Sequence, residues 1–235
     1  MVKLSVVAPI YNEEENIGLL HESITNAVKD KVESYEIVLV NDGSKDRSAL
    51  LLDELSRQDS HVKVIHFEKN CGQTAAIYAG LKGSTGELVA LIDADLQTDP
   101  RDIFKLMPYI PNMDFVNGKR VRRRDTVVKK VSSRVGNGVR NWLTGDQIYD
   151  TGCPMKLMKR EVADSYYLYE GQHRFLPTLA KINGFKVIEV AVSHQERQHG
   201  VSKYGVFNRA FVGLMDAIVI GWLRKRVIRY QIKGH

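Results

Sequence analysis

The first half of the chain alternates short apolar runs with segments of helical periodicity, and this alternation restricts the fold more than any other feature. Four apolar runs rich in Val and Ile lie at residues 3–10, 35–42, 62–67 and 87–95. Three segments with apolar residues at helical spacing separate them, at residues 13–31, 44–58 and 72–84. Near-continuous apolar strands separated by helices predict an α/β fold in which a mostly parallel central sheet is covered by helices on both faces.

The second half continues with elements that are less regular. We expect strands at residues 114–121 and 185–194 and helices at residues 127–144 and 173–183. The helix at 127–144 is weakened by Gly136 and Gly138. We expect two units: a domain of residues 1–205 and a C-terminal amphipathic, basic helix within residues 206–235.

Polar groups follow three of the predicted strands at the point where each strand ends. They are "YNEEE" after the first strand, "NDGSKD" after the second and "DADLQTD" after the fourth. In open α/β sheets ligands bind beyond the carboxyl ends of the strands. We therefore expect a single site that gathers these three segments.

Three aspartates follow the fourth strand. If the strand conformation continues, Asp93 and Asp95 project in the same direction, and Gln97 adds a third oxygen at the same spacing. Paired carboxylates suit a hard divalent cation such as Mg²⁺, and a diphosphate leaving group needs such a Lewis acid. Asp99 followed by Pro100 instead predicts a helix N-cap, which needs no ligand.

The two other polar segments have a structural and a functional interpretation. Asp42, at a strand end, is a candidate acceptor for a base or a ribose, whereas a turn and a helix cap explain Ser44 or Asp46. Acidic residues 13–15 are favourable in a first helical turn by themselves. Tyr11 and Glu13 are the candidates for contact with a nucleotide.

The net charge of +6 is unevenly distributed. Residues 118–140 hold nine Lys or Arg and one acid, and residues 197–235 hold eight and one, so these segments carry +8 and +7 and the remainder −9. We expect an anionic partner near the two basic segments. Nucleic acid is a poor candidate, because no aromatic side chains that stack on bases are interleaved in "GKRVRRRDTVVKK".

The tail has two interpretations. Its apolar run, 210–223, is broken by Asp216 and is shorter than a membrane span, and Arg224, Lys225 and Arg226 follow it. It is either a helix in the membrane interface or a helix packed on the domain. It is also a candidate contact for a homodimer or a membrane-protein partner. With two distant cysteines and no signal peptide, this predicts a cytoplasmic protein bound peripherally to the inner face of the membrane.

The order and spacing of "APIYNEEENI", "VLVNDGSKDRS" and "LIDADLQTDP" resemble glycosyltransferase family 2, which has the nucleotide-diphospho-sugar transferase fold called GT-A. "GKR", "SSRVGN", "DTGCPMKLMKREV" and the final "HQERQHGVSKYG" are similar to the polyprenyl-phosphate sugar synthases, the group of dolichol-phosphate mannose synthase. The resemblance covers nearly all of residues 3–225.

This resemblance implies a role for each matching residue. The nucleotide-sugar donor would be held by Pro9, Tyr11, Glu13, Asp42, Asp93 and Arg197. A Mg²⁺ or Mn²⁺ ion would be held by Asp93, Asp95 and Gln97. The residues implied in catalysis are Asp95 and the phosphate-binding Arg120, Arg134 and Lys203, with Ser132 or Ser133 beside Arg134.

The implied reaction moves a hexose or N-acetylhexosamine from a GDP- or UDP-sugar to undecaprenyl or dolichyl phosphate, with inversion. A phosphate acceptor is already an anion, so the protein has to supply positioning and charge compensation, not a base. A saccharide hydroxyl acceptor would need a base, for which Asp150 is the candidate. A non-enzymatic module that binds anionic membranes is the third alternative.

Overall fold

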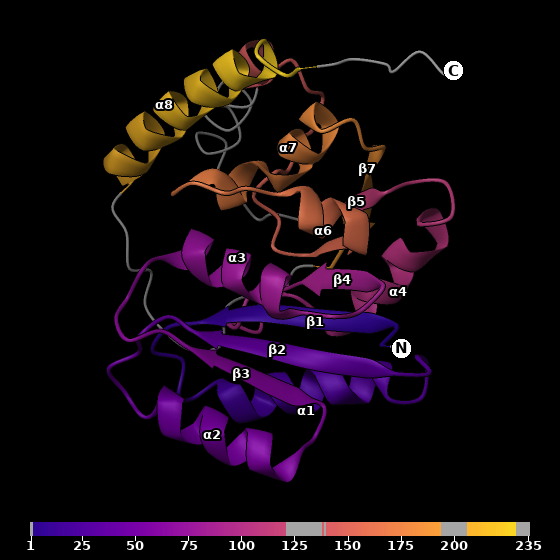
Figure 1. Ribbon diagram of the computed structural model, residues 1–235, viewed down its shortest axis with the longest axis vertical. Coiled ribbons are helices and arrows are strands. Elements are labelled where there is room, and N and C mark those ends of the chain that lie inside the picture. Colours follow the sequence, from indigo (N-terminus) through magenta and orange to yellow (C-terminus); the bar gives the residue numbers. More distant parts are fainter. Residues whose placement is uncertain (1, 121–137, 139, 194–205, 229–235) are drawn as a thin grey trace, which may run out of the picture.

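The computed structural model describes residues 2–120, 138, 140–193 and 206–228. Seven strands form one sheet in the order β3-β2-β1-β4-β6-β5-β7 (Figure 1). Their bounds are β1 Leu4–Ile10, β2 Tyr35–Asn41, β3 Val62–His66, β4 Leu88–Leu91, β5 Phe115–Arg120, β6 Lys156–Lys159 and β7 Val187–Val192. Every neighbouring pair is parallel except the two pairs that β6 makes with β4 and β5, so the sheet is mostly parallel as predicted.

Helices surround this sheet. The longer ones are α1 Ile17–Val28, α2 Ser48–Gln58, α3 Gln73–Gly83 and α8 Val206–Arg224. The shorter ones are α4 Ile103–Leu106, α6 Arg160–Ser165, α7 Leu176–Ile182 and the 3₁₀ turns η1 Pro100–Asp102, η2 Met107–Tyr109 and η3 Gln172–Phe175. Of the helix expected at 127–144, the structure describes Gly138 and residues 140–144, which are helical.

Two apolar cores fill the two faces of the sheet. One face of β1, with Leu4 and Val6, packs against α1, α2 and α4. The opposite face, with Val7, packs against α3, α6 and α7. This is the consequence of strands that are apolar on both faces, and it confirms the prediction that helices cover both sides of the sheet.

Two sequence predictions about element bounds are wrong, and one strand was missed. Strand β4 ends at Leu91, not at Asp95, and residues 94 and 95 lie in a turn. Helix α1 begins at Ile17 and has no acidic residue in its first turn, because residues 14–16 form a separate turn before it. Strand β6 was not expected: its residues, KLMK, include two lysines and no Val or Ile, although they pair on both sides, with β4 and β5.

Helix α8 confirms the predicted C-terminal helix and lies beside α7 (Figure 1). Ala217 and Ile220 are buried against Phe175 and Ile182, so one face of the helix packs on the domain. The other face is also apolar and is exposed: it consists of Leu214, Met215, Ile218, Val219 and Trp222. Packing on the domain is thus observed for one face of α8, and contact of the other face with a membrane stays a prediction.

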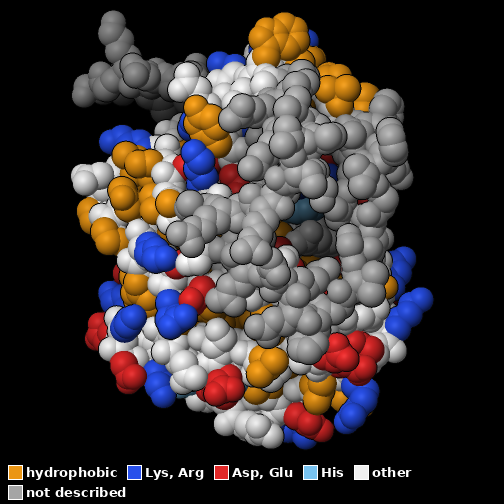
Figure 2. All heavy atoms as spheres, turned by 180° about the vertical axis from the view of Figure 1, so that it is seen from behind, with side chains coloured by type: hydrophobic (Ala, Val, Ile, Leu, Met, Phe, Trp, Pro, Cys, Tyr) orange, Lys and Arg blue, Asp and Glu red, His pale blue; other side chains and the backbone are white. Residues whose placement is uncertain are grey.

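The exposed face of α8 contrasts with the surface around the N-terminal half. Seen from behind, acidic and basic side chains are mixed over the lower part of the molecule, and hydrophobic side chains lie at its upper end (Figure 2). Among the described residues, α8 included, no helix combines the length and the apolar character that crossing a bilayer requires.

Candidate active site

The described residues among those implied in donor binding lie at or near one edge of the sheet, where its parallel strands end. The register aligns Ile10 with Asn41 at the ends of β1 and β2, so Tyr11 and Asp42 leave the sheet at the same level. It also aligns Leu91 of β4 with Lys156 of β6, and Lys156 with Asn117 of β5. The segments that begin at Asp93 and Arg120 therefore leave the sheet at this same edge, as parallel strands require.

Asp42 is buried at the end of β2 and holds the loop before α3. Its carboxylate accepts hydrogen bonds from the backbone N–H of Cys71, at 2.7 Å, and of Gly72, at 3.0 Å, and from the Asn70 side chain, at 2.9 Å. Gly43 follows with φ +63°, and a Cβ there would lie 2.3 Å from the carbonyl carbon of Lys69. The sequence did not predict this loop-holding contact of Asp42.

The segments after β1 and β2 are interlocked by hydrogen bonds. Asn12 donates its N–H to Ser44 Oγ at 3.0 Å and accepts the N–H of Lys45 at 2.7 Å. Glu13 donates its N–H to Ser48 Oγ at 3.0 Å, and its carboxylate accepts from Asn16 at 2.6 Å. The backbone around Tyr11 and Glu13 is thereby fixed by the loop that carries Asp42. Pro9, on β1, is aligned with Val40 of β2.

Asp93, Asp95 and Gln97 lie in a turn and not on an extended strand. Leu96 has φ +59°, and Asp95 accepts the backbone N–H of Gln97 at 3.1 Å. Strand alternation is therefore the wrong reason for grouping the three. Gln73, the first residue of α3, donates its side-chain amide to Asp93 Oδ1 at 3.1 Å. Among the described residues, no group of three His, Cys, Asp or Glu side chains is arranged to hold a metal ion.

The donor set of this turn nevertheless fits a hard cation. It offers two carboxylates and an amide oxygen, and Mg²⁺ usually takes one or two protein carboxylates and leaves its other positions to water and substrate phosphates. Burial lowers the pKa of Lys156, and the negative charge of Asp93 is among the influences that oppose this effect; the same charge adds to the raised pKa of Arg120. Asp93 thus lies within electrostatic range of two cations.

Asp99 has the capping role expected of it. Its side chain accepts the backbone N–H of Arg101 at 2.9 Å, with Pro100 as the first residue of η1. The Arg101 side chain also bonds the carboxylate, and this lowers the pKa of Asp99.

Arg120 and Asp150 form a bidentate ion pair within electrostatic range of Asp93. Arg120 Nε donates to Asp150 Oδ2 at 2.8 Å and Nη2 donates to Oδ1 at 2.7 Å, and each side chain is 14% exposed. Burial lowers the pKa of Arg120, but the hydrogen bond and charge of Asp150 outweigh burial and leave it raised. Glu189 on β7 accepts the backbone N–H of Asp150 at 2.9 Å and so holds this segment to the sheet.

Lys156 lies buried beneath the same segment, and the sequence analysis missed it. Its Nζ donates to Asn117 Oδ1 at 3.0 Å and to the Thr151 carbonyl at 3.1 Å. Burial lowers the pKa of Lys156, while the charges of Asp150 and Asp93 oppose that effect. The available signal was a lysine placed between apolar residues in "CPMKLMK", because a lysine in an apolar run is either exposed or buried with partners. Cys153 is buried, as expected, and burial raises the pKa of its thiol.

Several implied site residues fall outside the described part of the chain. They are Arg134, Arg197 and Lys203, with Ser132 and Ser133. Their roles stay predictions.

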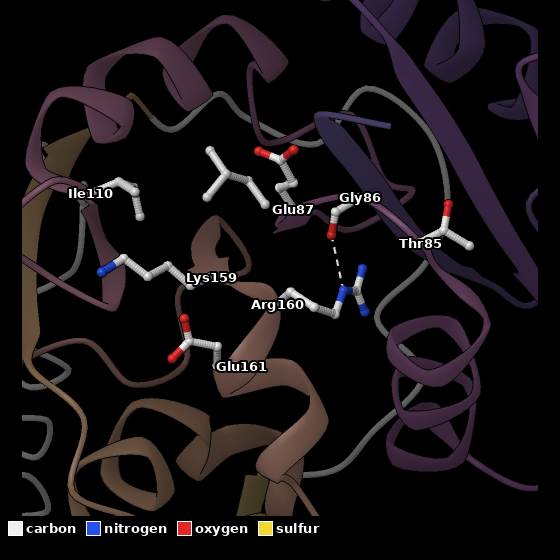
Figure 3. A pocket seen from close by; sticks show the side chains of 8 residues that line it. Thr85, Gly86, Glu87, Ile110, Lys159, Arg160 and Glu161 are labelled. Atoms are coloured by element: carbon white, nitrogen blue, oxygen red, sulfur yellow. Dashed lines mark hydrogen bonds between the residues drawn. The ribbon is translucent and has the colours of Figure 1, made fainter. Parts of the chain in front are cut away.

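A pocket lies at the opposite edge of the sheet, at the amino end of β4. Gly86, Lys159 and Arg160 are among its lining residues (Figure 3). Arg160 Nε donates to the Gly86 carbonyl at 2.9 Å, and Lys159 pairs with Asp114 at 2.8 Å. This pocket is separate from the predicted site, and its two cations are engaged within the protein.

Three comparisons place the chain among known proteins. Residues 5–167 match the model of glycosyl transferase family 2. Undecaprenyl-phosphate 4-deoxy-4-formamido-L-arabinose transferase of Photorhabdus laumondii is 37% identical over 204 residues, which are 86% of this chain and 63% of that protein. Dodecaprenyl-phosphate galacturonate synthase of Rhizobium johnstonii is 32% identical over 241 residues, covering 100% of this chain and 70% of that protein.

Solved structures share the fold at low identity. Glucosyl-3-phosphoglycerate synthase of Mycobacterium tuberculosis, in complex with Mn²⁺ and uridine-diphosphate-glucose, superposes with a TM-score of 0.68 at 18% identity, over 97% of this chain and 80% of that one. This likeness confirms the predicted GT-A fold. The chain spans just under two thirds of the length of the P. laumondii relative. By its match over residues 5–167 and its relatives, the chain belongs to glycosyltransferase family 2.

Proposed function

We propose that this chain transfers a sugar from a nucleotide-diphospho-sugar to a polyprenyl phosphate, with a divalent cation and with inversion at the anomeric carbon. The observation that carries this proposal is the ion pair of Arg120 and Asp150. The named relatives from P. laumondii and R. johnstonii support it, since their names specify undecaprenyl and dodecaprenyl phosphate.

The ion pair bears on the choice of acceptor. A hydroxyl acceptor has to lose a proton to a base, and Asp150 is the candidate base. Both oxygens of Asp150 accept from the Arg120 guanidinium, and Oδ2 also accepts the backbone N–H of Arg120 at 3.2 Å. A carboxylate that is engaged in this way is a poor proton acceptor. A lipid phosphate, which needs no base, fits this site better.

Asp150 then acts as the support of Arg120. A guanidinium held by a two-pronged contact has a fixed plane, and its remaining N–H groups point in a defined direction. Arg120, at the carboxyl end of β5, would present them to an anion that approaches this edge of the sheet. The buried charge of Lys156 below adds to the positive potential.

We propose that Asp93, Asp95 and Gln97 hold Mg²⁺ or Mn²⁺, which neutralises charge on the donor diphosphate when bound. The lipid phosphate oxygen would attack the anomeric carbon as the bond from that carbon to the diphosphate breaks. The bonding electrons leave with the nucleoside diphosphate, and the product is a sugar phosphodiester. No proton transfer is needed, so the protein's residues position the reactants and balance charge.

The exposed face of α8 supports a site at the membrane surface. Its apolar residues run up to Trp222, and the exposed Arg224, Lys225 and Arg226 follow directly. An apolar face with an aromatic residue and adjoining cations is typical of helices that lie in the interface of anionic bilayers. We propose that residues 206–235 act as this membrane-binding unit beside the domain of residues 1–205, and that the protein binds peripherally to the inner face of the cytoplasmic membrane.

The direct test is an assay of sugar transfer. Purified protein is incubated with undecaprenyl phosphate and radiolabelled UDP- or GDP-sugars, with Mn²⁺, with Mg²⁺ or with EDTA. We expect label in the organic phase with at least one donor, and none with EDTA. Label that stays in the aqueous phase with every donor would contradict the proposal, as would transfer of equal rate in the Asp95→Asn variant.

A further inference from the structure

The amino end of helix α3 contacts the candidate metal-binding turn. Gln73, the first residue of α3, donates its Nε2 to Asp93 Oδ1 at 3.1 Å. The hydrogen bond lies at the exposed surface, so water competes for both partners and the bond alone cannot fix the amide. The position of Gln73 must therefore be set by its backbone.

The backbone on both sides of Gln73 is held firmly. On the preceding side, Asp42 accepts the N–H of Gly72 at 3.0 Å. On the following side, Thr74 is buried, and its Oγ1 lies 2.6 Å from His173 Nδ1 and accepts the N–H of Gly171 at 3.0 Å. Gln73 thus lies between two anchors, Asp42 after β2 and the segment 171–173, which is remote in sequence.

The second anchor ties Thr74 to two residues of the remote segment. Burial lowers the pKa of His173 to about 4, and the charge of Arg174 adds to this effect, so the imidazole is neutral at pH 7. The Thr74 hydroxyl accepts the N–H of Gly171 and shares a second hydrogen bond with His173 Nδ1. The tautomer of His173 decides which partner donates in that second bond, because the hydroxyl can donate its proton or accept again. In either direction the bond holds Thr74 to residues 171–173.

We propose that Gln73 is a positioning residue for Asp93, and that the Thr74–His173 hydrogen bond sets the place of Gln73. The proposal rests on the proposed function in one respect, namely that Asp93 binds the cation with the donor diphosphate. An amide is suited to this role because it orients the carboxylate without neutralising it. A glutamate at position 73 would repel Asp93, and a lysine would compete with the cation.

Metal binding measures this role without a turnover assay. Mn²⁺ is titrated with UDP or with GDP present, and unbound Mn²⁺ is followed by its electron paramagnetic resonance signal. In Gln73→Leu, which keeps the size but loses the donor, we expect Mn²⁺ affinity to fall about 3- to 10-fold, the effect of one exposed hydrogen bond to a charged group. Gln58→Leu, an exposed glutamine at the end of α2, is the matched control.

Two variants of Thr74 test the second half of the proposal. Thr74→Val removes the hydroxyl at nearly constant shape and should lower Mn²⁺ affinity in the same direction as Gln73→Leu. Thr74→Ser restores the hydroxyl and should restore affinity. Thermal unfolding is measured in parallel, so that a general loss of stability is distinguished from a loss of metal binding at unchanged Tm.

The outcomes separate this proposal from the proposed function. Wild-type affinity in Gln73→Leu would overturn the role of Gln73, and wild-type affinity in Thr74→Val would overturn the role of the hydrogen bond. If the wild type bound no Mn²⁺ with either nucleotide, the cation role of Asp93 and this proposal would both be wrong. If the variants bound Mn²⁺ weakly while the wild type made no lipid-linked sugar, the positioning role would stand and the proposed acceptor would fall.

Discussion

Arg120 holds Asp150 by two hydrogen bonds, of 2.8 and 2.7 Å, at the point where β5 ends. The pair joins the end of one strand to the segment that precedes β6. Lys156 supports the same segment, because its Nζ donates to the carbonyl of the next residue, Thr151. One carboxylate and two cations are thus built into a small region beside Asp93.

This ion pair predicts that Arg120 and Asp150 act as one unit. Asp150→Asn and Arg120→Lys each remove the two-pronged contact, and we expect each to lower kcat/KM by about 10²-fold, the cost of losing one well-placed donor at a charged transition state. The double variant should be little worse than either single variant, because only one interaction is lost. Steady-state kinetics of the three variants measures this.

The pH dependence provides the control for this prediction. If Asp150 only supports Arg120, the residual activity of Asp150→Asn keeps the pH profile of the wild type. A general base would instead show itself by the disappearance of the acidic limb of the profile. Lys119→Gln, an exposed neighbour on β5, should leave kcat/KM unchanged.

Replacing the buried Lys156 should lower the stability of the folded protein. Lys156→Met keeps the bulk of the side chain but leaves Asn117 Oδ1 and two backbone carbonyls, of Thr151 and Cys153, without their buried donor. We expect the free energy of unfolding to fall by about 3 kcal/mol. Urea denaturation measures it. Lys159→Met, which removes a more exposed ion pair on the same strand, should cost about 1 kcal/mol or less, and an equal loss in both variants would be inconsistent with this account.

The lowered pKa of His173 should make the stability of the protein depend on pH. Its pKa is about 4 in the folded state and 6.5 in the unfolded chain, so between these values the unfolded state binds the proton and the folded state does not. Stability therefore falls as pH falls from 6.5 towards 4, by about 2 kcal/mol between pH 7 and pH 5 from this residue. The stability difference between wild type and His173→Asn should shrink by that amount, and a constant difference would refute the assignment.

Helix α8 predicts binding to anionic vesicles. Replacing Ile218 and Trp222 with serine removes two exposed apolar side chains and should weaken binding about 10-fold or more, without lowering the Tm, because neither residue belongs to the buried face. Co-sedimentation with vesicles of phosphatidylglycerol measures it. Leu50→Ser, at an exposed leucine of α2, is the matched control. Equal binding by the two variants would argue against α8 as the membrane contact.

Much of this architecture is predictable from the sequence. The runs of Val and Ile and the helical periodicity between them predict β1 to β4, the mostly parallel sheet and the edge at which Asp42 and Asp93 lie. Strand β6 escaped prediction because its four residues, KLMK, contain two lysines and none of the Val or Ile that mark the other strands. Because β6 was not in the predicted sheet, the alignment of Lys156 with Leu91 and Asn117 could not be predicted.

The contacts within the site were the least predictable part. Gln73 and Asp93 are separated by 20 residues, and Thr74 and His173 by 99, so their pairing depends on how α3 packs against the sheet and η3. Local patterns also misplace the turn that holds Asp93 and Asp95, because Leu96 adopts a positive φ that no propensity for leucine suggests. Residue types indicated the chemistry, while tertiary packing decided which residues support it.

The central claim is that the acceptor is a phosphate anion that attacks without a base. It is tested most directly by offering the protein equal amounts of undecaprenyl phosphate and undecaprenol with one labelled donor and Mn²⁺, and by determining the linkage of the product by mass spectrometry and phosphorus NMR. We predict label only in a sugar phosphodiester of inverted anomeric configuration. Label in a glycoside of undecaprenol, or in a phosphodiester of retained configuration, would contradict the account.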